Sequence, residues 1–281
     1  MSEENVPALR MNVGAATDDT IGVRRRAYAW TSVRAVVLPL ALAMAVLIAW
    51  EMGVTIGNVP EVILPAPSAV AKVIVSQHAI LLKHAIPTTL ESAGGFAIAT
   101  LLGIGLAVLI TYSTIAREAL YPNLVFFQLI PKIALAPLFI IWLGIGPQSR
   151  LAFSVFIAFF PIVIATAAGL LSVDRNMVRL CRSLTATQWQ VFRGVRFPAA
   201  LPHIFSGMKI AMTLSIIGVI IGEFITAQQG LGYLIIFATA RADTVVAMAA
   251  IVVLCVAGLA LYGLVAAAEW FANRTYGMPR E

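Results

Sequence analysis

Hydrophobic residues gather in six long runs along this chain, and each run approaches or exceeds the roughly 20 residues with which an α-helix crosses a lipid bilayer. The runs are continuously apolar, without the every-second-residue alternation of a membrane barrel strand. They therefore predict transmembrane helices. The runs cover about residues 34–52, 86–111, 121–143, 150–171, 203–225 and 245–271.

Composition agrees with this pattern, because 60% of the 281 residues are hydrophobic and 11% are charged, which excludes a water-soluble globule. We expect an all-α, polytopic membrane protein with about six transmembrane helices. Its membrane domain would cover residues 34–271, between a disordered cytoplasmic tail at 1–33 and a short cytoplasmic tail at 272–281. No cleaved signal peptide is expected, because the first apolar run starts past residue 33.

Arginine and lysine are distributed unevenly between the connecting segments, and these residues are retained on the cytoplasmic side of membranes. This distribution predicts that both termini and the segment 172–202 lie in the cytoplasm. The retention of arginine and lysine on the cytoplasmic side then explains the net charge of +6, and no nucleic-acid partner is expected. The cytoplasmic arginines would be Arg10, Arg24, Arg25, Arg26, Arg34, Arg117, Arg175, Arg179, Arg182, Arg193, Arg196, Arg274 and Arg280, against Lys72, Lys83, Arg150 and Arg241 on the opposite side.

The polar segment 172–202 has the spacing of two short helices. Three arginines and three apolar residues each recur at intervals of four and three residues, which is typical of an amphipathic helix. They are Arg175, Arg179 and Arg182, and Met177, Cys181 and Leu184. Downstream, Thr185 with Gln188 and Thr187 with Gln190 each fit a reciprocal N-terminal cap. The segment therefore predicts a helix–turn–helix between two membrane spans.

Two large aromatic residues, Trp189 and Phe192, lie among polar neighbours such as Gln188 and Gln190, before Pro198 and Pro202 end the segment. We interpret the helix pair as a docking surface for a soluble partner. Trp189, Gln190 and Phe192 would form its centre, because aromatic anchors dominate such contacts. The alternative is that Trp189 and Phe192 pack the segment onto its own transmembrane helices.

Lys132 is the most conspicuous charge inside a predicted span, and it directly follows Pro131. Leaving its ammonium against lipid would cost about 2.5–3.5 kcal/mol, so we expect it to face a cavity, a carboxylate or another helix. Lys132 could attract an anionic or polar solute, pair with a carboxylate such as Glu223, or lie at a dimer interface. Lys209 is expected to extend to the cytoplasmic membrane surface.

The segment 172–202 resembles the signature of binding-protein-dependent ABC importer permeases, which is Glu-Ala-Ala, three spacers, Gly, nine spacers, an apolar residue, one spacer and Leu-Pro. Further matches are "ILPAPSAV", "IPKIALAPLFIIWLGIG" and "GEFITAQQGLGYLI", so the resemblance covers most of residues 60–240. Within the family, the sequence resembles the nitrate, sulfonate, taurine and bicarbonate branch. The signature positions are occupied here by Arg179, Leu180, Cys181, Thr185, Val195, Phe197 and Pro198.

Two positions depart from this signature. Arg179 reverses the charge of the usual glutamate, and Thr185 replaces a glycine that often allows a left-handed turn, which a β-branched residue disfavours. We expect the hydroxyl of Thr185 to hold the turn by capping instead. The departure at Arg179 implies a different partner surface, or a heterodimer in which a paralogous permease supplies the standard loop.

The resemblance implies a multi-pass protein of the bacterial inner membrane that forms the translocation pathway of an ATP-driven importer. Its implied partners are two cytoplasmic ATPase subunits, a second permease copy or a paralogue, and an extracytoplasmic solute-binding protein. The solute would be a small anion or polar organic molecule, such as a sulfonate, nitrate, taurine or a vitamin precursor. The residues implied in ATPase coupling are Arg179, Leu180, Cys181, Thr185, Gln188, Trp189, Gln190, Phe192 and Pro198.

Residues on the outer side are candidates for the solute pathway, together with Pro131 and Lys132. Glu223, Gln228 and Gln229 would form an outer gate that faces the solute-binding protein, and the alternative is an ordinary re-entrant turn. Other ionisable residues near span ends are expected to be hydrated, Glu91 and Glu51 at the outer surface and Glu269 at the inner one. Close helix packing is expected at Gly94, Gly95, Gly103, Gly105, Gly218 and Gly222, and kinks at Pro87, Pro131, Pro137 and Pro161.

The chemistry that the sequence offers points away from an enzyme. It contains no Gly-Lys pair and therefore no phosphate-binding loop, so we expect no bound cofactor in this chain and ATP with Mg²⁺ in the partner ATPase. No metal site is expected from His78, His84 and His203, and no disulfide from Cys181 and Cys255. The competing interpretation is a stand-alone secondary transporter or channel.

Overall fold

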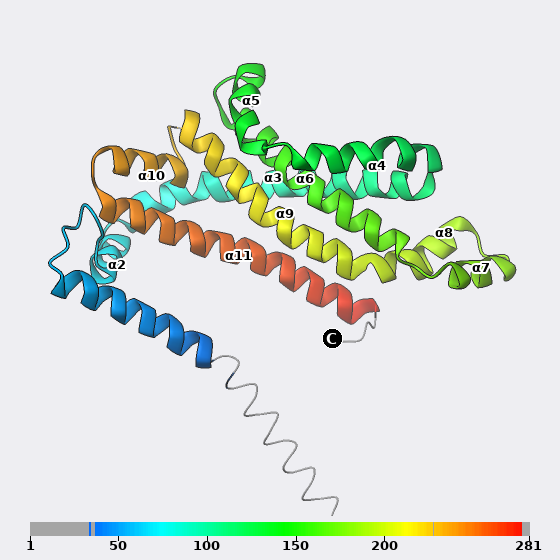
Figure 1. Ribbon diagram of the computed structural model, residues 1–281, viewed down its shortest axis with the longest axis horizontal. Coiled ribbons are helices and arrows are strands. Elements are labelled where there is room, and N and C mark those ends of the chain that lie inside the picture. Colours follow the sequence, from blue (N-terminus) through cyan, green and yellow to red (C-terminus); the bar gives the residue numbers. More distant parts are fainter. Residues whose placement is uncertain (1–33, 35–36, 227, 277–281) are drawn as a thin grey trace, which may run out of the picture. The chain divides into compact units, whose positions relative to one another are not determined.

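The computed structural model describes residues 34, 37–226 and 228–276, and within them every regular element is a helix (Figure 1). The all-α prediction is therefore confirmed. The chain divides into two units, Met1–Val59 and Pro60–Glu281. The predicted tail 1–33 lies outside the described residues, whereas the predicted tail at 272–281 is helical as far as Tyr276.

The first unit contains the helix Val37–Ile56, which is long and apolar enough to cross a membrane. Its hydrophobic side chains are exposed, with 64% of Leu38 and 68% of Leu42 accessible. Such exposure is typical of a helix whose surface meets lipid. The first predicted span is confirmed, and it ends a few residues later than the sequence pattern indicated.

The described part of the second unit contains four uninterrupted helices that are long and apolar enough to span a membrane. They are α3 (His78–Tyr112), α6 (Pro147–Leu171), α9 (Phe197–Thr226) and α11 (Thr244–Tyr276). The shorter helices are α2 (Pro67–Ser76), α4 (Thr114–Leu129), η1 (Lys132–Leu135), α5 (Ala136–Leu143), α7 (Arg175–Ser183), α8 (Gln188–Val191), η2 (Phe192–Arg196) and α10 (Leu231–Ala240). Their order agrees with the predicted spans, except in the third.

The third predicted span is a broken helix, because α4 and the following η1–α5 segment are bent by 91° relative to each other. Ile130 at the break is extended, with φ −65° and ψ 134°, which is the conformation that a residue before proline favours. Pro131 then has no N–H with which to continue the helix. The sequence predicted a kink here, and the same physical cause produces a full break. Pro87 and Pro161, by contrast, lie inside continuous helices.

The core of the second unit forms where α6 packs against α3 and α9. Hydroxyl groups connect the three helices, because Ser154 and Ser215 lie 2.7 Å apart through their Oγ atoms and Ser215 donates to the carbonyl of Ser92 at 2.7 Å. A Cβ added at Gly218 would lie 2.8 Å from the Cα of Ser154. Close helix approach at this glycine, as the sequence predicted, is therefore confirmed.

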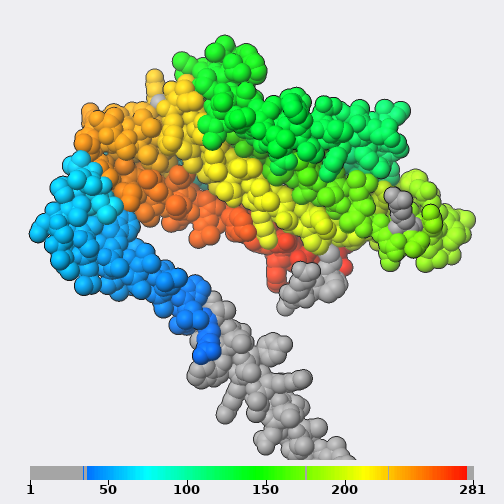
Figure 2. Space-filling view, in the orientation of Figure 1, coloured from blue at the N-terminus to red at the C-terminus, as the bar shows by residue number. Residues whose placement is uncertain are grey.

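Helix α6 connects two ends of the second unit (Figure 1). At one end, α6 leads into α7 and α8, which form a lobe at the right of Figure 2. We call this the hairpin end. At the other end, α6 begins near the connection between α9 and α10, and we call this the α10 end. The coupling residues predicted from sequence lie at the hairpin end, and the predicted gate residues Gln228 and Gln229 lie at the α10 end.

Candidate functional site

Helix α7 at the hairpin end is closed by defined caps. Asp174 accepts a hydrogen bond from the backbone N–H of Asn176 at 2.8 Å, which satisfies a free donor of the first turn. At the other end of α7, the N–H of Ala186 donates to the carbonyl of Cys181 at 3.1 Å, around Thr185 with φ +61°. This is the left-handed C-terminal turn that glycine usually makes.

Thr185 therefore keeps the backbone turn of the family signature although it is not a glycine. The predicted capping by its hydroxyl is wrong, because Oγ1 donates to the carbonyl of Leu184 at 2.7 Å instead of accepting from the next helix. A β-branched residue in this region costs on the order of 1–2 kcal/mol. The turn is held by backbone hydrogen bonds, including the one from Thr185 N–H to the carbonyl of Arg182 at 3.0 Å.

The second predicted cap, Thr187 with Gln190, is confirmed. The backbone N–H of Thr187 donates to Oε1 of Gln190 at 2.7 Å, and the N–H of Gln190 donates to Oγ1 of Thr187 at 3.3 Å. The Gln190 side chain is therefore engaged within its own helix. Gln188, beside it, is exposed at the first position of α8.

The two aromatic residues of the hairpin end have different surroundings. Phe192 is half-buried and contacts Tyr112 and Phe197, with ring centroids 6.0 and 5.8 Å away, so it packs the segment onto its own helices. Trp189 stacks on Phe192 at 5.5 Å and leaves 66% of its side chain exposed. The two interpretations drawn from sequence therefore apply to different residues: packing to Phe192, and an accessible surface to Trp189.

Helix α7 adds apolar side chains to this accessible surface. Met177, Leu180 and Leu184 recur at helical spacing and are 55%, 62% and 73% exposed. We define the lobe surface as these three residues together with Trp189. These four residues lie on α7, α8 and the turn between them, and apolar side chains exposed together in this way are typical of interaction sites. Of the other predicted coupling residues, Arg179 is exposed, and Cys181 and Pro198 are half-buried.

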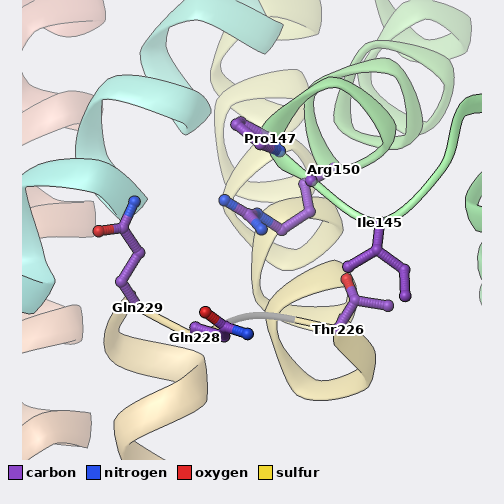
Figure 3. Close-up of a pocket in the computed structure, with 7 residues that line it drawn as sticks. Ile145, Pro147, Arg150, Thr226, Gln228 and Gln229 are labelled. Atoms are coloured by element: carbon purple, nitrogen blue, oxygen red, sulfur yellow. The ribbon is translucent and has the colours of Figure 1, made fainter.

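A cavity of about 480 Å³ lies at the α10 end (Figure 3). It brings together Gln228 and Gln229, which the sequence placed at an outer gate, with Arg150 from the first turns of α6. Figure 3 shows the two amides and the guanidinium around a common space. The remaining lining residues are Ile145, Gly146, Pro147 and Thr226.

Sequence reasoning did not foresee the role of Arg150. Its guanidinium donates to both carboxylate oxygens of Glu91 on α3, at 2.8 and 2.5 Å, and the arginine side chain is 4% exposed. The expectation that Glu91 is a hydrated surface residue is therefore wrong. Two opposite charges near the starts of different apolar spans were the available signal, because such charges need a partner when buried.

Glu223 is also buried rather than facing outward, with 1% of its surface exposed. Its carboxylate accepts hydrogen bonds from the Thr88 hydroxyl and the Gly232 N–H, each at 2.7 Å. Thr88 in turn accepts from the N–H of Leu231 at 2.8 Å. Glu223 therefore fixes the start of α10 to α3 and α9, where the helix dipole favours a negative charge. The Glu223 side chain is therefore an internal clamp in this structure, and its part in an outer gate stays a prediction.

Lys132 lies at the break between α4 and α5, with Pro131 exposed beside it. Its ammonium donates to the carbonyl of Gln128 at 3.1 Å and lies 5.3 Å from the centre of the Phe160 ring. The alternative of a pair with Glu223 is wrong, because Glu223 is engaged elsewhere. The predicted pathway residues are therefore divided between this break, the clamp at Glu223 and the cavity at Gln228.

Lys209, which the sequence predicts to extend to the cytoplasmic membrane surface, has a partner on another helix. It forms an ion pair with Glu269 at 2.5 Å, and both side chains are partly exposed, at 26% and 22%. The pair connects α9 to α11. Two residues expected to be solvated separately are therefore partners.

Comparisons with known proteins agree with these features. The family described as "Binding-protein-dependent transport system inner membrane component" matches residues 99–273. A probable ABC transporter permease protein of Haemophilus influenzae is 34% identical over 84% of this chain and 95% of its own length. The riboflavin transport system permease protein RibX of Chloroflexus aurantiacus is 34% identical over 81% of this chain and 85% of its own length.

The fold has solved counterparts as well. A chain of the MetNI methionine ABC transporter, in an inward-facing conformation, superimposes with a TM-score of 0.55 at 19% identity, covering 67% of this chain and 95% of that one. The likeness concerns the fold alone. The described residues contain five helices long enough to span a membrane, one bent helix pair and a capped helix pair between α6 and α9. Together with the family match, these features show that the chain belongs to the inner-membrane permease components of binding-protein-dependent ABC transport systems.

Proposed function

We propose that this permease forms the translocation pathway of an ATP-driven importer and that α7 and α8 transmit the movement of a separate ATPase to the membrane helices. The observation that carries the proposal is the lobe surface, on which Leu184 and Trp189 are 73% and 66% exposed, before α9 begins at Phe197. A partner that covered these side chains would remove apolar area from water.

The connection from this surface to the membrane helices is short. Trp189 stacks on Phe192, and Phe192 contacts Tyr112 at the end of α3 and Phe197 at the start of α9. A force on Trp189 would therefore reach two spanning helices through packed rings. In addition, α8, η2 and α9 form one helical stretch, Gln188–Thr226, so that α8 moves with its span.

The orientation that fits this function places the hairpin end in the cytoplasm, together with both termini. The arginine-rich connections at this end support it, since cations are retained on the cytoplasmic side. The ATPase subunits, expected to be two, would bind ATP and Mg²⁺, and this chain would bind no cofactor. A second permease, identical or paralogous, would complete the pathway.

The solute is proposed to be a small anion or a polar organic molecule. Support comes from the α10 end, where amide and guanidinium groups line a cavity of about 480 Å³, within the range of small-molecule sites. The relative RibX is named for riboflavin transport. The α10 end would face an extracytoplasmic solute-binding protein.

The proposal is tested by isolating the tagged chain from membranes of its own host and measuring ATP hydrolysis in the purified material. An associated ATP hydrolase, present in a fixed ratio to the permease, is expected. The opposing result is a chain that is isolated without a hydrolase and that accumulates riboflavin or taurine in vesicles under an ion gradient. That result would identify a stand-alone carrier.

A further inference from the structure

A second cavity, of about 450 Å³, lies at the hairpin end and is rich in arginine. Its charged lining comes from three different elements, α4, α7 and η2, and its apolar lining from the end of α6 and from the segment that follows. We call it the arginine pocket. The lining residues are Arg117, Arg179, Arg182 and Arg196, with Leu170, Leu171, Val173 and Val178.

The arginine pocket contains four cations and no carboxylate. Among the described residues, the ion pairs are Arg150 with Glu91 and Lys209 with Glu269, and neither includes an arginine of the pocket. A guanidinium stays protonated at any physiological pH, so the four positive charges cannot be relieved by loss of a proton. Gathering them around one cavity is favourable when an anion occupies it.

Two of the arginines are held in place by the protein itself. Arg117 donates to the carbonyls of Ile110 and Thr111 at 3.4 and 3.2 Å, at the end of α3. The guanidinium of Arg196 lies 5.5 Å from the ring centre of Tyr112. These contacts hold two of the lining arginines in place before any ligand binds, which lowers the entropic cost of binding.

The other two arginines, Arg179 and Arg182, are exposed on α7. They form no ion pair with a described carboxylate, so their charge is available to a ligand. Arg179 occupies the position at which the family signature has glutamate. A glutamate there would place a negative charge in the pocket, so this departure has a physical consequence for what the pocket can bind.

The apolar residues decide which anion fits best. Leu170 and Leu171 are the last residues of α6, a 25-residue helix that is apolar enough to span a membrane, so the pocket opens where a span ends. Val173, after α6, and Val178, on α7, continue this apolar lining. A ligand with a phosphate next to a hydrocarbon stem matches both parts of the lining, and basic pockets at the cytoplasmic membrane boundary hold such headgroups.

We propose that the arginine pocket binds the phosphate headgroup of an anionic phospholipid. The phosphate would accept hydrogen bonds from the guanidinium groups, whose planar donors suit phosphate oxygens. The proposal rests on the orientation proposed above, with the hairpin end in the cytoplasm. Because the pocket joins α4, α6, α7 and η2, a bound lipid would tie the coupling segment to the membrane domain.

The experiment uses the purified, delipidated full chain without any ATPase, so its outcome is independent of the coupling proposal. Native mass spectrometry would measure binding of short-chain phosphatidylglycerol and of phosphatidylcholine with the same acyl chains. We expect phosphatidylglycerol to bind about tenfold more tightly or better. Equal binding of the two lipids would overturn the proposal.

Variants of the pocket arginines test whether phosphatidylglycerol binds in the arginine pocket. Arg179→Gln with Arg182→Gln should lower the affinity for phosphatidylglycerol about tenfold, toward that for phosphatidylcholine. The matched control, Arg193→Gln with Arg274→Gln, removes the same charge from exposed arginines that do not line the pocket and should change the affinity less than about twofold. An equal loss in both double variants would show a general charge effect and would overturn the proposal.

Two further measurements distinguish a loss of lipid binding from misfolding, and a bound lipid from a bound soluble anion. Arg179→Lys with Arg182→Lys should retain most of the preference for phosphatidylglycerol, which a variant that merely misfolds would not do. Inorganic phosphate should compete only weakly with the lipid. If phosphate binds as tightly as phosphatidylglycerol, the occupant is a soluble anion and the lipid proposal is wrong.

Discussion

Arg150 on α6 and Glu91 on α3 form a two-point ion pair in which the arginine is 4% exposed. Removing one partner of such a pair leaves a buried charge without compensation, which costs about 3–5 kcal/mol. We therefore expect Glu91→Gln to lower the free energy of unfolding by about that amount. Unfolding of the purified protein in detergent, followed by tryptophan fluorescence against denaturant concentration, would measure the change.

The second ion pair provides the control. Lys209 and Glu269 are 26% and 22% exposed, so water screens their interaction. Glu269→Gln should cost less than about 1 kcal/mol. Equal losses in the two variants would contradict the difference in burial on which the prediction rests.

Gly218 allows α9 to approach α6, because an added Cβ would lie 2.8 Å from the Cα of Ser154. Gly218→Ala must push backbone apart, and we expect it to lower the free energy of unfolding by about 1–3 kcal/mol. Gly105 has nothing within 4 Å of its Cβ direction, so Gly105→Ala should be neutral or stabilise α3 by up to about 1 kcal/mol. A destabilised Gly105→Ala variant would show that the position is packed in the assembled protein.

Substitutions at two threonines near the turn of the hairpin end should change the free energy of unfolding in opposite directions. Thr185 has φ +61°, so Thr185→Gly should relieve strain and raise the free energy of unfolding by up to about 1 kcal/mol. Thr187 caps α8, so Thr187→Ala should lower the free energy of unfolding by about 1 kcal/mol. Hydrogen exchange of the α7 and α8 amides would measure both effects locally. Faster exchange in Thr185→Gly would contradict the strain argument.

Trp189 is the exposed aromatic residue of the lobe surface, with 66% of its side chain accessible. We expect Trp189→Ala to weaken ATPase association by about 2 kcal/mol or more, because aromatic residues dominate docking contacts. The measurement is the amount of ATPase that co-purifies with the tagged permease. Trp142 on α5 is similarly exposed, at 68%, and Trp142→Ala should leave co-purification unchanged. An unchanged yield for Trp189→Ala would remove this residue from the docking contact.

The spanning helices and the capped helix pair were predictable from sequence, because each rests on a local cause. The length of an apolar run predicts a membrane span such as α6, and the spacing of Thr187 and Gln190 predicts the N-terminal cap of α8. The break at Pro131 was predicted as a kink, since local sequence does not state how far two helix halves diverge. Thr185 was misjudged because backbone hydrogen bonds around it outweigh the residue's own preference.

The partners of buried charges were not predictable, because they depend on how distant helices approach. Arg150 and Glu91 are 59 residues apart, and Glu223 and Thr88 are 135 apart. A single sequence shows that such groups need partners, but not which ones they find. For the same reason, the sequence assigned the arginines of the arginine pocket to topology, to a helix face and, for Arg179, to ATPase coupling, but not to a shared cavity. Their gathering around one cavity required the fold.

Cross-linking in cells tests the coupling role of the hairpin end most directly. A photoreactive residue in place of Leu184, on the lobe surface, should join the permease to an ATP-binding subunit while import is active. The same residue in place of Gln229, which lines the cavity at the α10 end, should not form this product. Active import with no cross-link to a nucleotide hydrolase from position 184 would contradict the account.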